Sequence, residues 1–320
     1  MSPPLPKQAR NITLVGATGN LGSAILSALL AEKIHTVSVI TRTGSKSTKE
    51  NILTAAGVAQ VHRGSYDDAR FLDGALQGQD VLILAVGHGG YEAQDPPDAR
   101  RRASGRGLGR PCEFGSDRTN AKLYADVGAT LMAAKEQYRA LAEELGLRWL
   151  GVVNNPWLDF CLRGGYFGVD AGRKTATLWS DCTARPNLAT LERVGRSLAA
   201  LLGLPQDELA DHYGNRWVYF SSFRASQRDI FESVLRATGT TEKEWEVKHQ
   251  SLEQDVRRFA AAEEANGNPF AKAMLLFPLT FADGYGGDYN DKVVDYELLG
   301  LEKEENMDEI IKKIVAETSA

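Results

Sequence analysis

Three glycines near the start of the chain have the spacing of a phosphate-binding loop. Gly16, Gly19 and Gly22 follow the apolar run 11–15 and precede a helical pattern with apolar residues on one face. Glycine lets the backbone approach a phosphate, and the helix that follows points free N–H groups at the anion. An ordinary glycine-rich turn is the alternative. The predicted dinucleotide site comprises Gly16, Thr18, Gly19, Asn20, Leu21 and Gly22.

The charge after the second predicted strand indicates which dinucleotide would bind. A site for NAD usually has an acidic residue about 20 residues beyond the glycines, where it accepts hydrogen bonds from the ribose 2′-hydroxyl. The strand at 36–40 is instead followed by Arg42 and Lys46. A guanidinium clamps a phosphate through two hydrogen bonds, and a lysine adds charge. We therefore predict NADPH as the cofactor, with solvated surface charges as the alternative.

Strand and helix patterns alternate through the first half of the chain. The run 80–86 is apolar and ends in Gly87 and His88, which we expect beside the cofactor; for His88 a plain polar loop residue is the alternative. The alternation predicts an α/β fold with a Rossmann-type, doubly wound parallel sheet. We expect a dinucleotide-binding domain at 1–157 and a smaller, substrate-binding α+β region at 158–320.

The stretch 95–110 interrupts this alternation. It is rich in arginine and contains Leu108 as its single large apolar residue. It therefore predicts neither an amphipathic helix nor a buried strand, although the sheet needs both here. Our hypothesis for this stretch is a short compensated frameshift, because the ordinary hydrophobic pattern of the chain resumes abruptly at Pro111. A basic loop for an anionic partner and a decayed gene product are the alternatives.

Composition limits the class of protein. The chain has 320 residues, a net charge of −5, 43% hydrophobic and 25% charged residues, which is ordinary for a globular protein. This balance speaks against a nucleic-acid partner, and no apolar run suggests a membrane span. The scattered cysteines and histidines show no metal spacing, and the polar, proline-rich start does not resemble a signal peptide. We expect a cytoplasmic protein without a metal.

Four motifs in order carry a resemblance to a known family. They are residues 16–22, 111–117, 135–139 and 152–157. The chain resembles the NmrA-like and isoflavone reductase-like proteins of filamentous fungi, which are atypical relatives of the short-chain dehydrogenases. The resemblance covers most of the chain and is strongest from Ile12 to Phe160. It implies an NADPH-binding Rossmann domain followed by a smaller substrate domain.

The resemblance also implies roles for two basic residues. Lys135 matches the lysine that lies beside the nicotinamide and serves as a general acid or base, and Arg139 matches the basic residue one turn later. A solvated lysine on an outer helix face is the alternative. The chain departs from the family pattern at 95–110 and at Cys182 and Pro186. It also lacks the Tyr-x-x-x-Lys pair of ordinary short-chain dehydrogenases.

These observations predict an NADPH-dependent reductase of a small aromatic or other secondary metabolite. Its expected pocket residues are Phe114, Asn155, Trp157 and Phe160, although the aromatic ones could equally belong to the core. The alternative is a dinucleotide-binding redox sensor of the NmrA kind, which would bind a regulatory protein without turnover and could reside in the nucleus. The reductase needs only a small-molecule substrate as partner.

Overall fold

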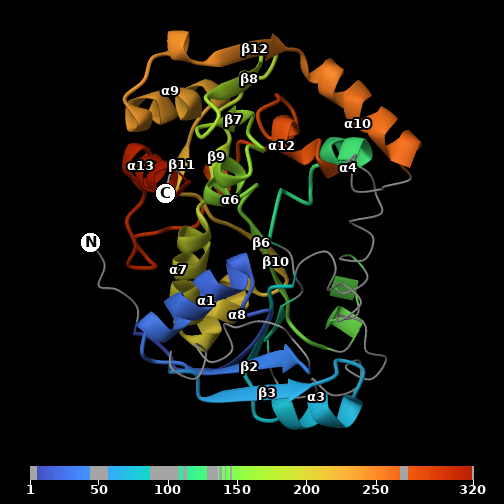
Figure 1. The fold of residues 1–320 in the computed structure, drawn as a ribbon. Coiled ribbons are helices and arrows are strands. Elements are labelled where there is room, and N and C mark those ends of the chain that lie inside the picture. Colours follow the sequence, from blue (N-terminus) through green and yellow to red (C-terminus); the bar gives the residue numbers. More distant parts are fainter. Residues whose placement is uncertain are drawn as a thin grey trace.

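The computed structural model describes residues 6–43, 57–86, 108–110, 114–127, 136, 139–140, 142–144, 146–266 and 273–318. Lys46, Gly87, His88 and Lys135 lie outside these residues. Figure 1 shows a parallel sheet with its helices at one end of the molecule and a second, mixed region at the other. Within the described part, no helix is both long and apolar enough to cross a membrane.

A five-stranded parallel sheet forms the first region. Its order is β3-β2-β1-β4-β5, which places β1 at the centre with the chain winding outward in both directions. This is the doubly wound order of a dinucleotide-binding fold. The strands are β1 (Asn11–Val15), β2 (Thr36–Arg42), β3 (Gln60–Gly64), β4 (Val81–Leu84) and β5 (Leu108–Arg110).

Two further strands extend this region beyond β5. β6 (Leu150–Val153) contacts β5 and pairs in parallel with β10 (Arg216–Tyr219). An isolated parallel bridge joins Gly115 to Val153, so the chain leaving β5 runs beside β6. The predicted division at residue 157 stays a prediction, since β10 lies far beyond it in sequence but belongs to this region.

The end of the arginine-rich stretch does form a strand. We expected none within 95–110, and this expectation is wrong for β5, which pairs with β4 in the register Val81 with Leu108 and Ile83 with Arg110. The reason is that ladder hydrogen bonds use the backbone, so β4 can align a neighbour that has only one apolar side chain, Leu108. Residues 95–107 and the frameshift hypothesis for them lie outside the described residues.

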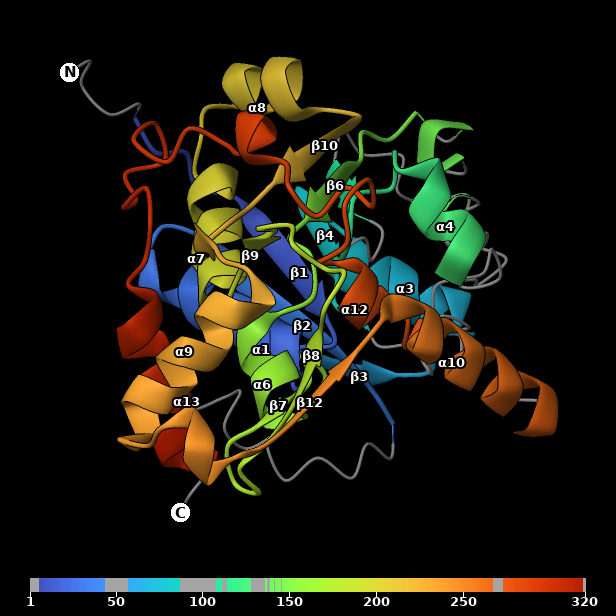
Figure 2. The ribbon, with the colours of Figure 1, turned by 90° about the horizontal axis from the view of Figure 1, so that it is seen from above.

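Side-chain alternation gives the sheet two apolar faces. Ile12, Leu14, Val37 and Val39 belong to a large core on one face, which is covered by α1 (Asn20–Ala31) and α7 (Leu191–Leu202). Gly195 allows the two helices to pack closely, because a Cβ there would lie 2.6 Å from the Ala24 carbonyl oxygen. Figures 1 and 2 show α1 and α7 side by side. α8 (Gln206–Tyr213) also packs on this core.

The other face of the sheet is covered by α3 (Ala69–Leu76). Leu72 and Ala75 of this helix pack with Val15 and Ile40. The Asp68 side chain caps the helix by accepting hydrogen bonds from the N–H groups of Arg70 and Phe71. Helices thus lie on both faces, which confirms the α/β class predicted from the sequence.

A second core lies in the C-terminal region, which Figure 2 shows from above with α10 at its periphery. A three-stranded sheet of order β12-β8-β7 and a short antiparallel pair, β9 with β11, hold it together. The strands are β7 (Val169–Asp170), β8 (Thr175–Trp179), β9 (Asn187–Leu188), β11 (Phe223–Arg224) and β12 (Glu246–Gln250). The helices are α4 (Ala121–Val127), α6 (Leu158–Arg163), α9 (Gln227–Thr238), η3 (Glu242–Glu244), α10 (Leu252–Asn266), α12 (Leu276–Leu279), η4 (Asn290–Lys292) and α13 (Met307–Thr318).

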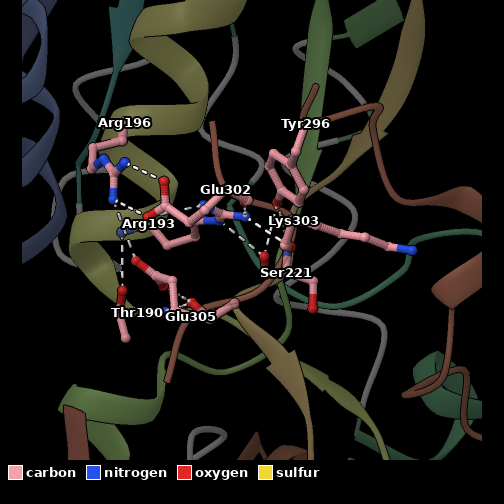
Figure 3. A network of polar contacts seen from close by, with 9 residues as sticks. Thr190, Arg193, Arg196, Ser221, Tyr296, Glu302, Lys303 and Glu305 are labelled. Carbon is pink, nitrogen blue, oxygen red and sulfur yellow. Dashed lines mark hydrogen bonds and ion pairs between the residues drawn. The ribbon is translucent and has the colours of Figure 1, made fainter. Parts of the chain in front are cut away.

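A buried arginine joins α7 to the C-terminal part of the chain (Figure 3). The guanidinium of Arg193 is fully buried and donates hydrogen bonds to the carbonyl oxygens of Ser221, Glu302 and Lys303. Its Cζ lies 3.8 Å from the centre of the Tyr296 ring. The Tyr296 hydroxyl in turn donates to the Ser221 carbonyl oxygen at 2.9 Å. This network fixes residues 296–303 against the first core.

The neighbouring ion pair is more exposed. Arg196 donates hydrogen bonds of 2.6 and 2.7 Å to the two carboxylate oxygens of Glu302, and they lower the pKa of Glu302 to about 2. The side chains are 34% and 45% exposed. Solvent screening therefore limits the contribution of this pair to stability.

Replacing Arg193 should therefore cost far more stability than replacing Arg196. We expect Arg193→Met to lower the free energy of unfolding by about 2–4 kcal/mol, because it removes the donors of one buried and two partly buried carbonyl oxygens. Arg196→Met should cost less than about 1 kcal/mol, since it removes an exposed pair. Urea denaturation of the two variants measures this. Equal losses would contradict the structural role given to Arg193.

Candidate functional site

The glycine loop between β1 and α1 has no room for a side chain at Gly16 or at Gly22. Gly16 has a φ of +86°, and a Cβ there would lie 2.4 Å from the Ala85 carbonyl oxygen. A Cβ on Gly22 would lie 2.0 Å from the carbonyl oxygen of Gly16. Both glycines are therefore required by close backbone contacts, one with the residue after β4 and one within the loop itself.

The first turn of α1 offers backbone N–H groups to an anion. Gly19 is the N-cap and has no side chain to cap the helix, and the first turn has no acidic residue. Thr18 is half-buried and Asn20 is exposed, while Leu21 is buried in the core. Thr18 and Asn20 can contact a ligand through their side chains, whereas Leu21 can do so through its backbone.

Arg42 lies at the same edge of the sheet as this loop. β1 and β2 are in register at Val15 and Ile40, so Arg42 ends β2 beside the point where β1 enters the loop. Its side chain is exposed, and the structure gives it no hydrogen bond or ion pair to another described residue. Burial raises the pKa of nearby Tyr66, and the charge of Arg42 opposes this shift. The guanidinium is thus available to an anionic ligand.

The predicted pocket residues follow β5 and β6. Phe114 and Trp157 both pack against the first core, and the Trp157 and Phe160 rings meet edge to face with centroids 6.0 Å apart. Asn155 is different, because its buried Nδ2 donates hydrogen bonds of 2.8 Å to the carbonyl oxygens of Asn187 and Gly287. Its amide nitrogen thus holds the backbone at Asn187 and Gly287 in place. A contact between Asn155 and a substrate stays a prediction.

Two further aromatic rings continue this row. The Phe160 ring stacks on Tyr166 at 5.3 Å between centroids, and Tyr166 stacks on Phe277 at 4.7 Å. All of these rings are half-buried. The sequence analysis missed Tyr166 and Phe277, since no spacing relates Phe277 to the motif that contains Trp157. The row gives the junction of the two cores an aromatic lining.

A charged pair fixes the loop after β5. Asp117 is buried, accepts hydrogen bonds from the N–H and hydroxyl of Thr119, and pairs with the Lys292 Nζ at 3.1 Å. Burial alone would raise the pKa of Asp117, but these partners outweigh it and lower the pKa overall. The charged carboxylate thus ties the end of β5 to the C-terminal segment at η4.

Arg139 lies away from this edge of the sheet. Its Cζ is 4.8 Å from the centre of the Trp217 ring and 5.7 Å from that of Trp149. Trp149 precedes β6 and Trp217 is near the start of β10, whereas the glycine loop follows the carboxyl end of β1. These contacts give Arg139 a packing role there, and its predicted cofactor contact stays a prediction.

Comparison with known proteins agrees with this geometry. Residues 8–96 match the model of the NmrA-like family. The chain is similar to the protein named Oxidoreductase aprR of Aspergillus flavus, with 30% identity over 312 residues that cover 95% of this chain and 98% of that protein.

Solved structures share the fold. A structure of isoflavone reductase aligns with a TM-score of 0.74 at 18% identity, covering 96% of this chain and 99% of that one. The complex of leucoanthocyanidin reductase from Vitis vinifera with NADPH aligns with a TM-score of 0.76 at 15% identity and the same coverage. The chain belongs to the NmrA-like family, and its fold is that of isoflavone reductase and leucoanthocyanidin reductase.

Among the residues that the structure describes, no group of three or more His, Cys, Asp or Glu side chains could hold a metal ion.

The structure brings some of the predicted site residues together. The glycine loop and Arg42 lie at one edge of the sheet, and Phe114, Trp157 and Phe160 lie farther along the same edge.

The glycine loop can be tested by adding single methyl groups. We expect Gly22→Ala to lower the free energy of unfolding by about 1–3 kcal/mol and to abolish NADPH binding, because the Cβ collides with the Gly16 backbone. Gly74→Ala is the matched control, since a Cβ on Gly74 in α3 meets no atom within 4 Å. It should stabilise the protein by up to about 1 kcal/mol.

Thermal denaturation and fluorescence titration with NADPH measure both effects. Normal NADPH affinity in Gly22→Ala would show that the loop is not the phosphate site.

Proposed function

We propose that this protein is an NADPH-dependent reductase of a small aromatic or related secondary metabolite. The observation that carries the proposal is the glycine cradle at the end of β1, with the Arg42 guanidinium at the same edge and without an ion pair to any described residue. A cradle that a single Cβ would fill fits a pyrophosphate against the first turn of α1. When bound, the dihydronicotinamide supplies a hydride to the substrate.

Arg42 supports NADPH rather than NADH. It ends β2, where a dinucleotide-binding fold places the adenosine ribose, and a guanidinium there can hold a 2′-phosphate through two hydrogen bonds. Lys46 would add a second positive charge. No acidic side chain from β2 competes for the ribose hydroxyl.

The half-buried aromatic row supports an aromatic substrate. Trp157, Phe160 and Tyr166 lie where the two cores meet, beside the carboxyl end of β6. The parts of these half-buried rings that remain accessible would contact a planar apolar ring, and Lys135 would exchange the proton, as the family resemblance implies.

Replacing Arg42 should reduce the preference for NADPH. We expect Arg42→Ala to weaken NADPH binding by about tenfold to a hundredfold, because it removes a charge-assisted contact with the 2′-phosphate. Affinity for NADH should stay unchanged. Arg216→Ala is the control, since Arg216 is an exposed arginine at the opposite edge of the sheet. Isothermal titration with both dinucleotides measures this, and equal losses for the two would contradict the proposed role.

A dinucleotide sensor without turnover is the second candidate. The match to the NmrA-like family model is confined to residues 8–96, which carry the proposed dinucleotide site and no residue of the aromatic row. A sensor would bind NADPH and pass the signal to a regulatory protein.

Lys135 distinguishes the two candidates. In a reductase, Lys135→Ala should lower NADPH consumption by at least about a hundredfold while the NADPH affinity changes far less. Absorbance at the dihydronicotinamide band measures consumption against a panel of aromatic ketones and enones. NADPH binding without consumption of NADPH with any substrate by the unmodified protein would favour the sensor.

A further inference from the structure

Within the part of the chain that the structure describes, one buried amide at the carboxyl end of β6 has no hydrogen-bond partner. The Asn154 side chain is fully buried, yet neither its Oδ1 nor its Nδ2 forms a hydrogen bond. The adjacent Asn155 is nearly as buried, but its Nδ2 is satisfied by two carbonyl groups. Buried polar groups without partners are rare in folded proteins and cost about 1–3 kcal/mol each. An Asn that serves only packing would be poorly placed here.

Two other unpartnered groups accompany it. Ser116 is buried with a free Oγ, and the Trp157 Nε1 is buried without an acceptor. The backbone places Ser116 near Asn154, because the Asn154 N–H donates to the carbonyl oxygen of Gly115 at 2.8 Å. An amide, a hydroxyl and an indole N–H where β5 and β6 end thus have no hydrogen-bond partner among the described residues.

The position of Asn154 relates it to the proposed cofactor. β5 is the last strand in the order β3-β2-β1-β4-β5, and β6 lies next to β5. β6 is therefore on the opposite side of β1 from β2, the strand that ends in Arg42. With the adenosine end at β2 and the pyrophosphate at the glycine loop, the dinucleotide must direct its other end toward β4, β5 and β6. The unpartnered groups therefore lie on the nicotinamide side.

We propose that Asn154, assisted by Ser116, binds the carboxamide of the nicotinamide ring. This inference rests on the proposed function. A carboxamide carries one acceptor oxygen and an NH₂ donor group, and the free Oδ1 and Nδ2 of Asn154 are the complementary pair. Binding would satisfy both atoms and hold the ring in one orientation. Asn154 would be a cofactor-positioning residue.

The test compares Asn154→Leu with Thr13→Val. Leucine matches asparagine in shape without polar atoms, and Thr13 in β1 is a fully buried residue whose hydroxyl is equally unpartnered. Isothermal titration uses NADP⁺ and 2′-phospho-ADP-ribose, a fragment without the nicotinamide ring. We expect Asn154→Leu to weaken NADP⁺ binding by about tenfold and to leave the fragment affinity unchanged. Thr13→Val should change neither affinity.

The outcomes separate this inference from the proposed function. Unchanged NADP⁺ affinity in Asn154→Leu would overturn the role of Asn154, as would equal losses for NADP⁺ and the fragment. If the unmodified protein binds neither ligand, the proposed function itself fails.

A second measurement needs no variant. The unmodified protein is titrated with NADP⁺ and with its nicotinic acid analogue, in which a carboxylate replaces the carboxamide. A carboxylate cannot donate to the Asn154 Oδ1, so we expect binding at least about tenfold weaker for the analogue. Equal affinities would overturn the proposal even if Asn154→Leu does not fold.

Discussion

The close contact between the glycine loop and the end of β4 is the constraint on which the rest of the structure depends. Residue 16 can lie this close to the Ala85 carbonyl group only because it has no side chain, and the same holds for Gly22 beside the carbonyl group of Gly16. This contact determines where α1 begins and how α1 is positioned on the sheet. A third glycine, Gly195, then lets α7 pack on α1. The absence of side chains at these glycines thus determines both the geometry of the anion-binding loop and the packing of α7 on α1.

Two sets of polar contacts hold the C-terminal segment in place. Arg193 and Tyr296 hold the C-terminal segment against α7 and Ser221, while Asp117 and Lys292 hold the same part of the chain against the end of β5. Each pair replaces water with hydrogen bonds of defined direction, so the junction has one arrangement rather than many. The aromatic row of Trp157, Phe160 and Tyr166 lies at this junction, and its shape depends on that arrangement.

Neighbouring residues of one type have different roles at the end of β6. Asn155 adopts a φ of +52° and uses its amide nitrogen to join three backbone segments. Asn154 remains without a partner in the same buried surroundings. The hydrogen bonds of Asn155 within the protein offset the cost of burying its amide nitrogen, whereas the amide of Asn154 is suited to a ligand.

The sequence by itself determined the strand, glycine loop and helix around Gly16, the basic end of β2 at Arg42, and the α/β class. These features depend on residues close together in the chain, whose periodicity and backbone preferences are local. The tertiary structure decided which distant residues meet. It brought Phe277 to Tyr166, β10 to β6 and Lys292 to Asp117, and it aligned β5 on β4 although β5 has a single apolar side chain. Such contacts follow from packing between segments far apart in the chain, which no local spacing encodes.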